Sequence, residues 1–195
     1  MHAPRKFRKA FMAQLLVSLR AAGQASKSMG LRERRDAVRL SSDVAMALAS
    51  ARARAAPRSS AAWARALVAR HAAERRNEAL MRRIMGGAGY EMAAAAAAAR
   101  SRKEARSRRI VRRSRRVCSG TAGRRRRLSL AASGGAGRCS AMVKARLQVL
   151  RSLVPGGEAL RGLSLLSETL DYVVCLKTQV ELMQCLCKGS RPKLG

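Results

Sequence analysis

The fold of this chain is best predicted from the segment Val143-Lys-Ala-Arg-Leu-Gln-Val-Leu-Arg-Ser-Leu-Val-Pro-Gly-Gly157. Its apolar residues recur at the spacing of one face of an α-helix: Val143, Leu147, Leu150 and Val154. Pro155 has no amide hydrogen, and the two glycines after it tolerate left-handed backbone. We therefore expect a helix that stops at this Pro-Gly-Gly turn.

A second amphipathic segment follows, Leu165-Leu-Ser-Glu-Thr-Leu-Asp-Tyr-Val-Val-Cys-Leu-Lys-Thr-Gln-Val-Glu-Leu-Met183. Its seam alternates steps of three and four residues, as in a coiled coil: Leu166, Thr169, Val173, Leu176, Val180, Met183 and Cys187. Two helices of this length cannot bury both stripes against each other, so they need a partner. The sequence predicts a dimerisation module with the pairing residues Val143, Leu147, Leu150, Leu153, Val154, Leu166, Leu170, Val173, Leu176, Val180 and Met183.

These two segments, joined by a short loop, resemble the helix-loop-helix domain of plant basic helix-loop-helix transcription regulators. The stretch from Cys175 onward looks closer still to the atypical, growth-inhibiting subgroup. The resemblance covers residues 143–187 and implies a nuclear transcriptional repressor with no enzymatic activity. It also implies heterodimers with other helix-loop-helix proteins and restraint of cell elongation in brassinosteroid and gibberellin responses. Homodimers stay open as an alternative.

The chain departs from DNA-binding members of that family just before the first helix. Aligned on Leu150, the positions that would read bases hold Ala132, Ala136 and Gly137. The surrounding Ser133–Ser140 stretch is rich in glycine, and each glycine costs a helix about 1 kcal/mol. Gly162 stands where the family places a phosphate-binding lysine. We therefore expect no sequence-specific DNA reading by this chain alone.

Composition and charge argue against one large globular core. The formal net charge is +31, and much of the apolar content is alanine. We predict an all-α chain in which an ordered helix-loop-helix module follows a loosely packed, partly disordered basic N-terminal region. The predicted boundaries are a basic amphipathic region over 1–56, a helical segment over 57–87, an Ala/Arg/Gly-rich linker over 88–142, the module over 143–187 and a tail over 188–195.

Within the basic region we expect three helices. The first covers about Pro4–Ala21 and stops at Gly23, with an amphipathic stripe of Phe7, Phe11, Leu15 and Leu19. The second covers about Leu31–Arg54. The third starts after Ser59 and Ser60, which are good N-cap residues, and ends at Gly86-Gly87. The isolated Trp63 is interpreted as a helix-packing residue.

Basic residues concentrate between positions 100 and 127, where Glu104 is the single acid. Blocks of this kind indicate nuclear import or contact with a phosphate backbone. The predicted localisation residues are Arg108, Arg109, Arg112, Arg113, Arg115, Arg116, Arg124, Arg125, Arg126 and Arg127. The alternative function is sequence-nonspecific nucleic-acid binding through this segment, and the acid-free first 31 residues leave an organellar transit peptide as a rival targeting signal.

Other chemistry finds little support in the sequence. The five cysteines have no metal-binding spacing, and the histidines are His2 and His71. No nucleophile–base set, phosphate loop or paired carboxylates can be assembled. The acids of the predicted module are interpreted as solvated helix positions: Glu158, Glu168, Asp171 and Glu181. No apolar run approaches the roughly 20 residues of a membrane-spanning helix. We expect no cofactor, metal, small-molecule substrate or membrane contact, and reduced thiols.

Overall fold

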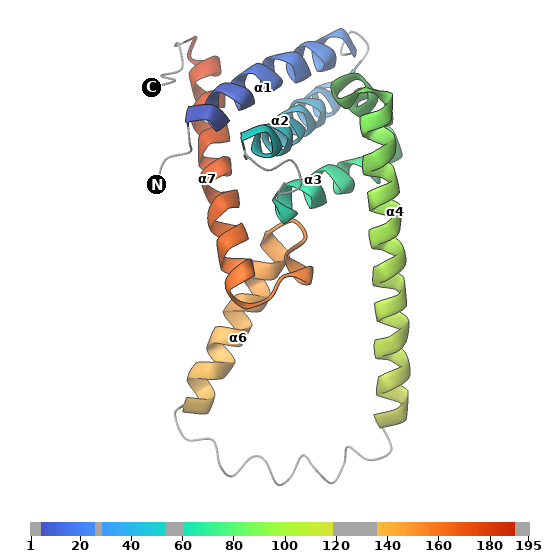
Figure 1. The fold of residues 1–195 in the computed structure, drawn as a ribbon. Helices are drawn as coiled ribbons and strands as arrows, with labels where there is room; N and C mark the ends of the chain where they lie inside the picture. The colour runs from blue at the N-terminus through green and yellow to red at the C-terminus, as the bar shows by residue number, and fades with distance from the viewer. Residues whose placement is uncertain (1–4, 26–28, 54–60, 119–135, 190–195) are drawn as a thin grey trace. The chain divides into compact units, whose positions relative to one another are not determined.

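The computed structural model describes residues 5–25, 29–53, 61–118 and 136–189. These residues form α1 (Arg5–Ala25), α2 (Leu31–Ala53), α3 (Ala62–Ala72), α4 (Glu78–Cys118), α6 (Ala136–Leu153) and α7 (Gly162–Cys187). Single 3-10 turns cover Arg75–Asn77 and Gly157–Ala159. The described ranges contain no strand, which confirms the prediction of an all-α chain (Figure 1).

The chain divides into two units. The larger unit comprises residues 1–97 and 151–195, and the smaller unit comprises residues 98–150. The larger unit contains α1, α2, α3, the first part of α4 and α7. The smaller unit contains the basic second part of α4 and most of α6.

One core cluster of the larger unit joins α1, α2 and α3 to α7. The α1 stripe predicted from the sequence supplies it, because Phe7, Phe11 and Leu15 are buried. The two phenylalanine rings stack with centroids 5.9 Å apart. Helices α2 and α3 add Met46, Trp63 and Leu67, and the C-terminal part adds Val154, Cys175 and Leu182. Residues from both ends of the sequence therefore share one core.

A second cluster joins α2 to the first part of α4. It contains Leu40 and Val44 from α2 and Met81, Ile84 and Tyr90 from α4. In Figure 1, α1, α2 and α3 lie between α7 and this part of α4. With two buried clusters, the N-terminal region is packed more closely than its alanine-rich, basic composition predicts.

The third predicted helix is two helices. After α3 the chain turns at Ala73, which is still helical, and at Glu74, which is extended. Helix α4 begins at Glu78. The side-chain amide of Asn77 donates to the carbonyl of His71 and satisfies a carbonyl at the end of α3. Trp63 belongs to α3, while Leu80 and Ile84 belong to α4. The proposed N-caps Ser59 and Ser60 lie outside the described residues, and Ala61 precedes α3 without a side-chain cap.

Glycine proves a weaker helix terminator here than the sequence predicts. Gly23 lies inside α1, which continues to Ala25. Gly86 has φ 77° and ψ 164°, which kinks α4, but the helix resumes and continues through the alanine run into the arginine block. Alanine and arginine are strong helix formers, and they offset the cost of one glycine.

The first of the two C-terminal helices ends at the predicted Pro-Gly-Gly turn but begins earlier than predicted. Helix α6 begins at Ala136, seven residues before Val143, and Gly137 lies inside it. The glycines at 134 and 135 lie outside the described residues. Helix α6 ends at Leu153, and Gly156 adopts a left-handed conformation with φ 76°. A Cβ atom on Gly157 would lie 2.5 Å from the carbonyl oxygen of Arg151, so the turn requires glycine there.

No helix among the described residues combines the length and apolarity needed to cross a membrane. Cys175 is buried, Cys185 is half-buried and Cys187 is exposed, and none of these three thiols forms a disulfide.

Candidate pairing surface of α7

One side of α7 is buried by the chain itself. This inner face is defined by Leu165, Cys175, Thr178 and Leu182, all of them buried. Cys175 and Leu182 belong to the core cluster that also contains Phe11, Leu15 and Trp63. Tyr172, Leu176 and Met183 pack against the edge of that cluster. Burial therefore extends along most of the helix.

Polar contacts fix the inner face in register. The backbone amide of Trp63 donates to Glu168 Oε2 at 3.2 Å, and its indole Nε1 donates to Asp171 Oδ2 at 2.7 Å. Gln179 Nε2 donates to Ser42 Oγ at 2.7 Å. The first two bonds place a carboxylate at the start of α3, where exposed amides and the helix dipole favour negative charge. Acids that the sequence assigned to solvated positions thus tie α7 to the N-terminal helices.

Aromatic packing strengthens the same contact. The rings of Trp63 and Tyr172 lie 5.1 Å apart between centroids and are tilted by 44°. Burial raises the pKa of the Tyr172 hydroxyl above its usual range, and the negative charge of Asp43 adds to the effect. Trp63 is fully buried, so its predicted role as a helix-packing residue is confirmed.

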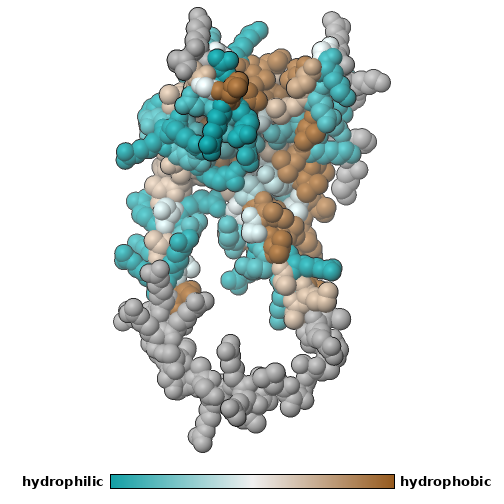
Figure 2. All heavy atoms as spheres, turned by 180° about the vertical axis from the view of Figure 1, so that it is seen from behind, coloured by the Kyte–Doolittle hydropathy of each residue, from teal (hydrophilic) through white to brown (hydrophobic). Residues whose placement is uncertain are grey.

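The opposite side of α7 is exposed and apolar. This outer face is defined by Leu163, Leu166, Leu170, Val173 and Val180, all of which are exposed. Steps of three and four residues place them along one line of the helix. Figure 2, seen from behind, shows hydrophobic atoms gathered along the right-hand side, where α7 lies. Lys177 interrupts the line between Val173 and Val180 and forms a 3.9 Å ion pair with Glu181.

The predicted pairing residues of α7 fall into two groups. Leu166, Leu170, Val173 and Val180 belong to the outer face. Leu176 and Met183 are half-buried at its border with the inner face. Thr169, predicted on the seam, donates its hydroxyl to the carbonyl of Leu165 at 2.6 Å, which satisfies that hydroxyl inside the helix.

The predicted pairing residues of α6 also differ in how far they are exposed. Val143 and Leu153 are exposed, whereas Leu147 and Leu150 are half-buried. Val154 follows the end of α6 and is buried in the core cluster of the larger unit. Val154 thus serves the core of this chain, and the other four side chains retain accessible surface.

The basic block lies partly on α4. Arg108 and Arg109 are exposed on that helix. Arg112, Arg113, Arg115 and Arg116 lie within its backbone span. Arg124, Arg125, Arg126 and Arg127 lie outside the described residues, as does Ala132.

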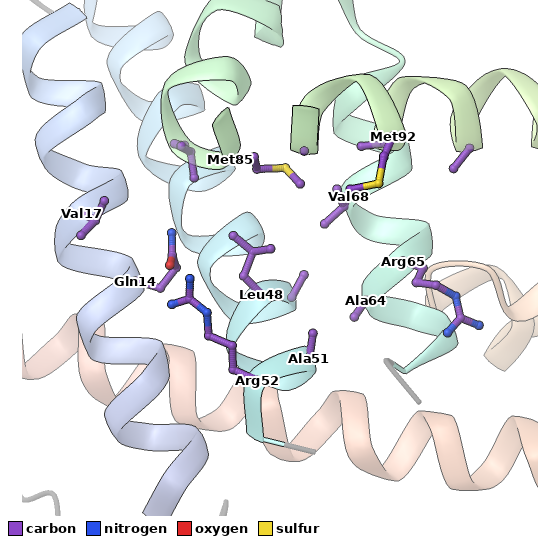
Figure 3. A pocket seen from close by; sticks show the side chains of 15 residues that line it. Gln14, Val17, Leu48, Ala51, Arg52, Ala64, Arg65, Val68, Met85 and Met92 are labelled. Atoms are coloured by element: carbon purple, nitrogen blue, oxygen red, sulfur yellow. The ribbon is translucent and has the colours of Figure 1, made fainter. Parts of the chain in front are cut away.

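A hollow of about 770 Å³ lies between α1, α2, α3 and the first part of α4. Figure 3 shows its apolar walls, with Leu48, Val68 and Met85 facing inward and Arg52 near Gln14. Its lining contains no acid, histidine or cysteine, so it offers no catalytic or metal-binding group. Throughout the described ranges, no cluster of His, Cys, Asp and Glu side chains could hold a metal ion.

Comparison with known proteins identifies the family. The chain is 32% identical to Transcription factor IBH1-like 1 of Arabidopsis thaliana over 163 residues, which covers 83% of this chain and 81% of that protein. It is 54% identical to Transcription factor IBH1 of Oryza sativa subsp. japonica over 41 residues, which covers 21% of this chain and 20% of that protein. No protein-family model and no solved structure matches. The long match to a protein of nearly the same extent shows that this chain belongs to the IBH1-like family of plant transcription factors, which is a family of regulators and not of enzymes.

Proposed function

We propose that this protein is a nuclear repressor that forms heterodimers with other helix-loop-helix proteins and blocks their binding to DNA. In this role it acts as a negative regulator of cell elongation in brassinosteroid signalling. The family membership and the resemblance of residues 143–187 to a helix-loop-helix domain support the class of partner.

The observation that carries this proposal is the exposed outer face of α7. Val173 is 52% exposed and Val180 54%, although both belong to a regular apolar line. Contiguous exposed apolar surface on a soluble chain marks a site of protein association. A helix with apolar residues at steps of three and four is the kind of surface that another such helix covers. The outer face therefore suits a helical partner.

The chain would block DNA binding by its partner because it lacks base-reading residues of its own. A helix-loop-helix dimer reads two half-sites, one with each subunit. Ala136 and Gly137, in the first turn of α6, offer no side chain that could hydrogen-bond to a base. Each lost base contact costs about 1–3 kcal/mol, so losing two weakens binding by about thirtyfold or more. A dimer containing this chain thus grips only one half-site.

A binding titration with matched variants tests the pairing step. The full chain is titrated into a DNA-binding plant helix-loop-helix protein by calorimetry, beside Val173→Asp and Lys188→Asp. Val173 lies on the outer face, whereas Lys188 is an exposed cap residue after the helix. We expect Val173→Asp to weaken binding at least about tenfold, because a carboxylate would be buried without a partner. Equal affinities of the wild-type chain and Val173→Asp would exclude the outer face as the pairing surface.

A second function is favoured by the exposed arginines of α4. Arg100 to Arg109 lie on a helix that continues the alanine run, and the side chains after Arg100 are exposed. Such a helix fits sequence-nonspecific contact with nucleic acid and also recognition by the nuclear import machinery. Affinity for a random duplex should then fall steeply with salt, and replacing Arg106, Arg108 and Arg109 by Gln should reduce that slope. A slope near zero would exclude direct phosphate contact.

A further inference from the structure

Helix α7 carries two apolar faces, and the structure fills one of them. Cys175 is 4% exposed and Val173 is 52% exposed, although they are two residues apart. Successive residues of an α-helix are rotated by 100°, so these two side chains point to nearly opposite sides. A helix-loop-helix partner laid on the outer face would therefore not need the surface that Trp63 and the N-terminal helices occupy.

We propose that the N-terminal helices α1, α2 and α3 are a permanent intramolecular partner of α7, which stays docked on the inner face while the outer face pairs with the second chain. This inference rests on the proposed pairing function. Under this inference, α7 pairs through its outer face alone and with one partner at a time.

The core argues that the N-terminal helices do not release α7. Leu182 and Cys175 share one cluster with Phe11, Leu15 and Met46, so separating α7 would open the core of α1, α2 and α3 as well. Apolar surface would enter water on both sides of the divided core. Release of α7 is therefore coupled to loss of packing among the N-terminal helices.

The polar contacts between α3 and α7 also favour the docked position of α7. Glu168 accepts from the amide of Trp63, and Asp171 accepts from its indole nitrogen. Release would return these donors to water and would remove the carboxylate from the start of α3. Residues 165–182 would then present a second apolar stripe, and α7 could associate with further helices on either side. Keeping the inner face covered makes α7 a one-sided pairing helix.

Trp63 gives a direct readout, because it is the single tryptophan of the chain and is buried at the contact between α3 and α7. The full chain is labelled with 5-fluorotryptophan, and its fluorine resonance is recorded with a soluble paramagnetic chelate. We expect protection from the chelate in the wild-type chain and in Val173→Asp. Cys175→Asp should lose that protection, because its charge falls on the inner face.

A charge at position 175 also threatens the folding of the larger unit, so a milder variant accompanies it. Asp171→Ala removes the acceptor of the indole nitrogen without cutting into the apolar cluster. The fluorine resonance of this variant should shift, and the chelate should broaden it more than in the wild-type chain. Helix content measured by circular dichroism should stay unchanged. Full protection in both Cys175→Asp and Asp171→Ala would overturn the docking of α7 on Trp63.

In the decisive experiment, an unlabelled DNA-binding helix-loop-helix protein is added to the labelled chain until the chain is saturated. Continued protection of the fluorine signal in the complex is the expected result. Loss of protection on pairing would show that the partner displaces the N-terminal helices, which overturns the inference and leaves the proposed pairing intact. Absence of a complex would instead contradict the proposed function, and the Cys175→Asp and Val173→Asp comparison would still decide the docking.

Discussion

Trp63 contacts the inner face of α7, and Lys177 lies on its outer face. The indole of Trp63 is fully buried and donates to the carboxylate of Asp171. Lys177 lies among the apolar side chains of the outer face and forms an ion pair with Glu181 of its own helix. Trp63 thus fixes the inner face to the rest of the chain, and Lys177 places a charge within the apolar outer face.

Replacing the indole tests the first of these roles. Trp63→Phe removes the donor to Asp171 and part of the core volume, whereas Asp171→Asn keeps an oxygen acceptor. We expect Trp63→Phe to lower the free energy of unfolding by about 1.5–3 kcal/mol, since hydrogen bonds to charged groups contribute that much. Asp171→Asn should cost less than half as much. Urea titration of the full chain measures both, and equal losses would contradict a charge-assisted bond.

Lys177 predicts a preference for heterodimers. In a parallel pair of identical α7 helices, two Lys177 side chains would lie at the same level and repel each other. A partner with an acidic or small polar residue there avoids that cost. Lys177→Leu should therefore increase self-association of the chain at least about threefold in sedimentation equilibrium, with Lys188→Leu as the control at an exposed site. Unchanged self-association would show that Lys177 does not limit homodimers.

At the scale of elements, the turn between α6 and α7 depends on glycine for two separate reasons. Gly156 needs a left-handed conformation, and Gly157 passes too close to the carbonyl of Arg151 to carry a Cβ atom. We predict that Gly157→Ala lowers the free energy of unfolding by about 1–3 kcal/mol, because the backbone must shift. The neighbouring exposed Glu158→Ala should change it by less than about 0.5 kcal/mol. Thermal unfolding compares them, and equal midpoints would mean that the turn relaxes without cost.

Helix existence could be predicted from the sequence better than helix ends. The Phe7, Phe11 and Leu15 stripe and the Pro-Gly-Gly terminator appear in the structure as predicted. The sequence does not predict the break between α3 and α4, because no proline or glycine marks Ala73–Asn77 and the apolar spacing continues across it. The prediction that the helix ends at Gly86-Gly87 is wrong, because the alanine run after the kink favours helix strongly enough for α4 to continue.

At the scale of the whole molecule, the outer face could be predicted and the inner face could not. Steps of three and four residues give Leu166, Val173 and Val180 directly. The contact between Trp63 and Glu168 joins residues 105 positions apart, and no local periodicity records such a pairing. Glu168 and Asp171 therefore looked like solvated acids. The fold makes them the attachment of α7 to the N-terminal helices.

The high net charge and the buried core of the molecule involve different residues. The net charge of +31 includes arginines of the second part of α4, of which Arg102, Arg106, Arg108 and Arg109 are exposed. Within the second core cluster, Leu80, Met81 and Ile84 are buried and uncharged. These arginines do not belong to the core clusters of the larger unit.

The central claim is that this chain removes a DNA-reading partner from its site by pairing. A mobility-shift titration tests it most directly, with a DNA-binding helix-loop-helix protein on a duplex carrying a CANNTG site. Increasing amounts of the full chain should dissolve the complex, and Val173→Asp should fail to do so at the same concentrations. If the chain instead shifts the duplex alone, and shifts a scrambled duplex equally, the arginines of α4 are the working surface and the pairing account is contradicted.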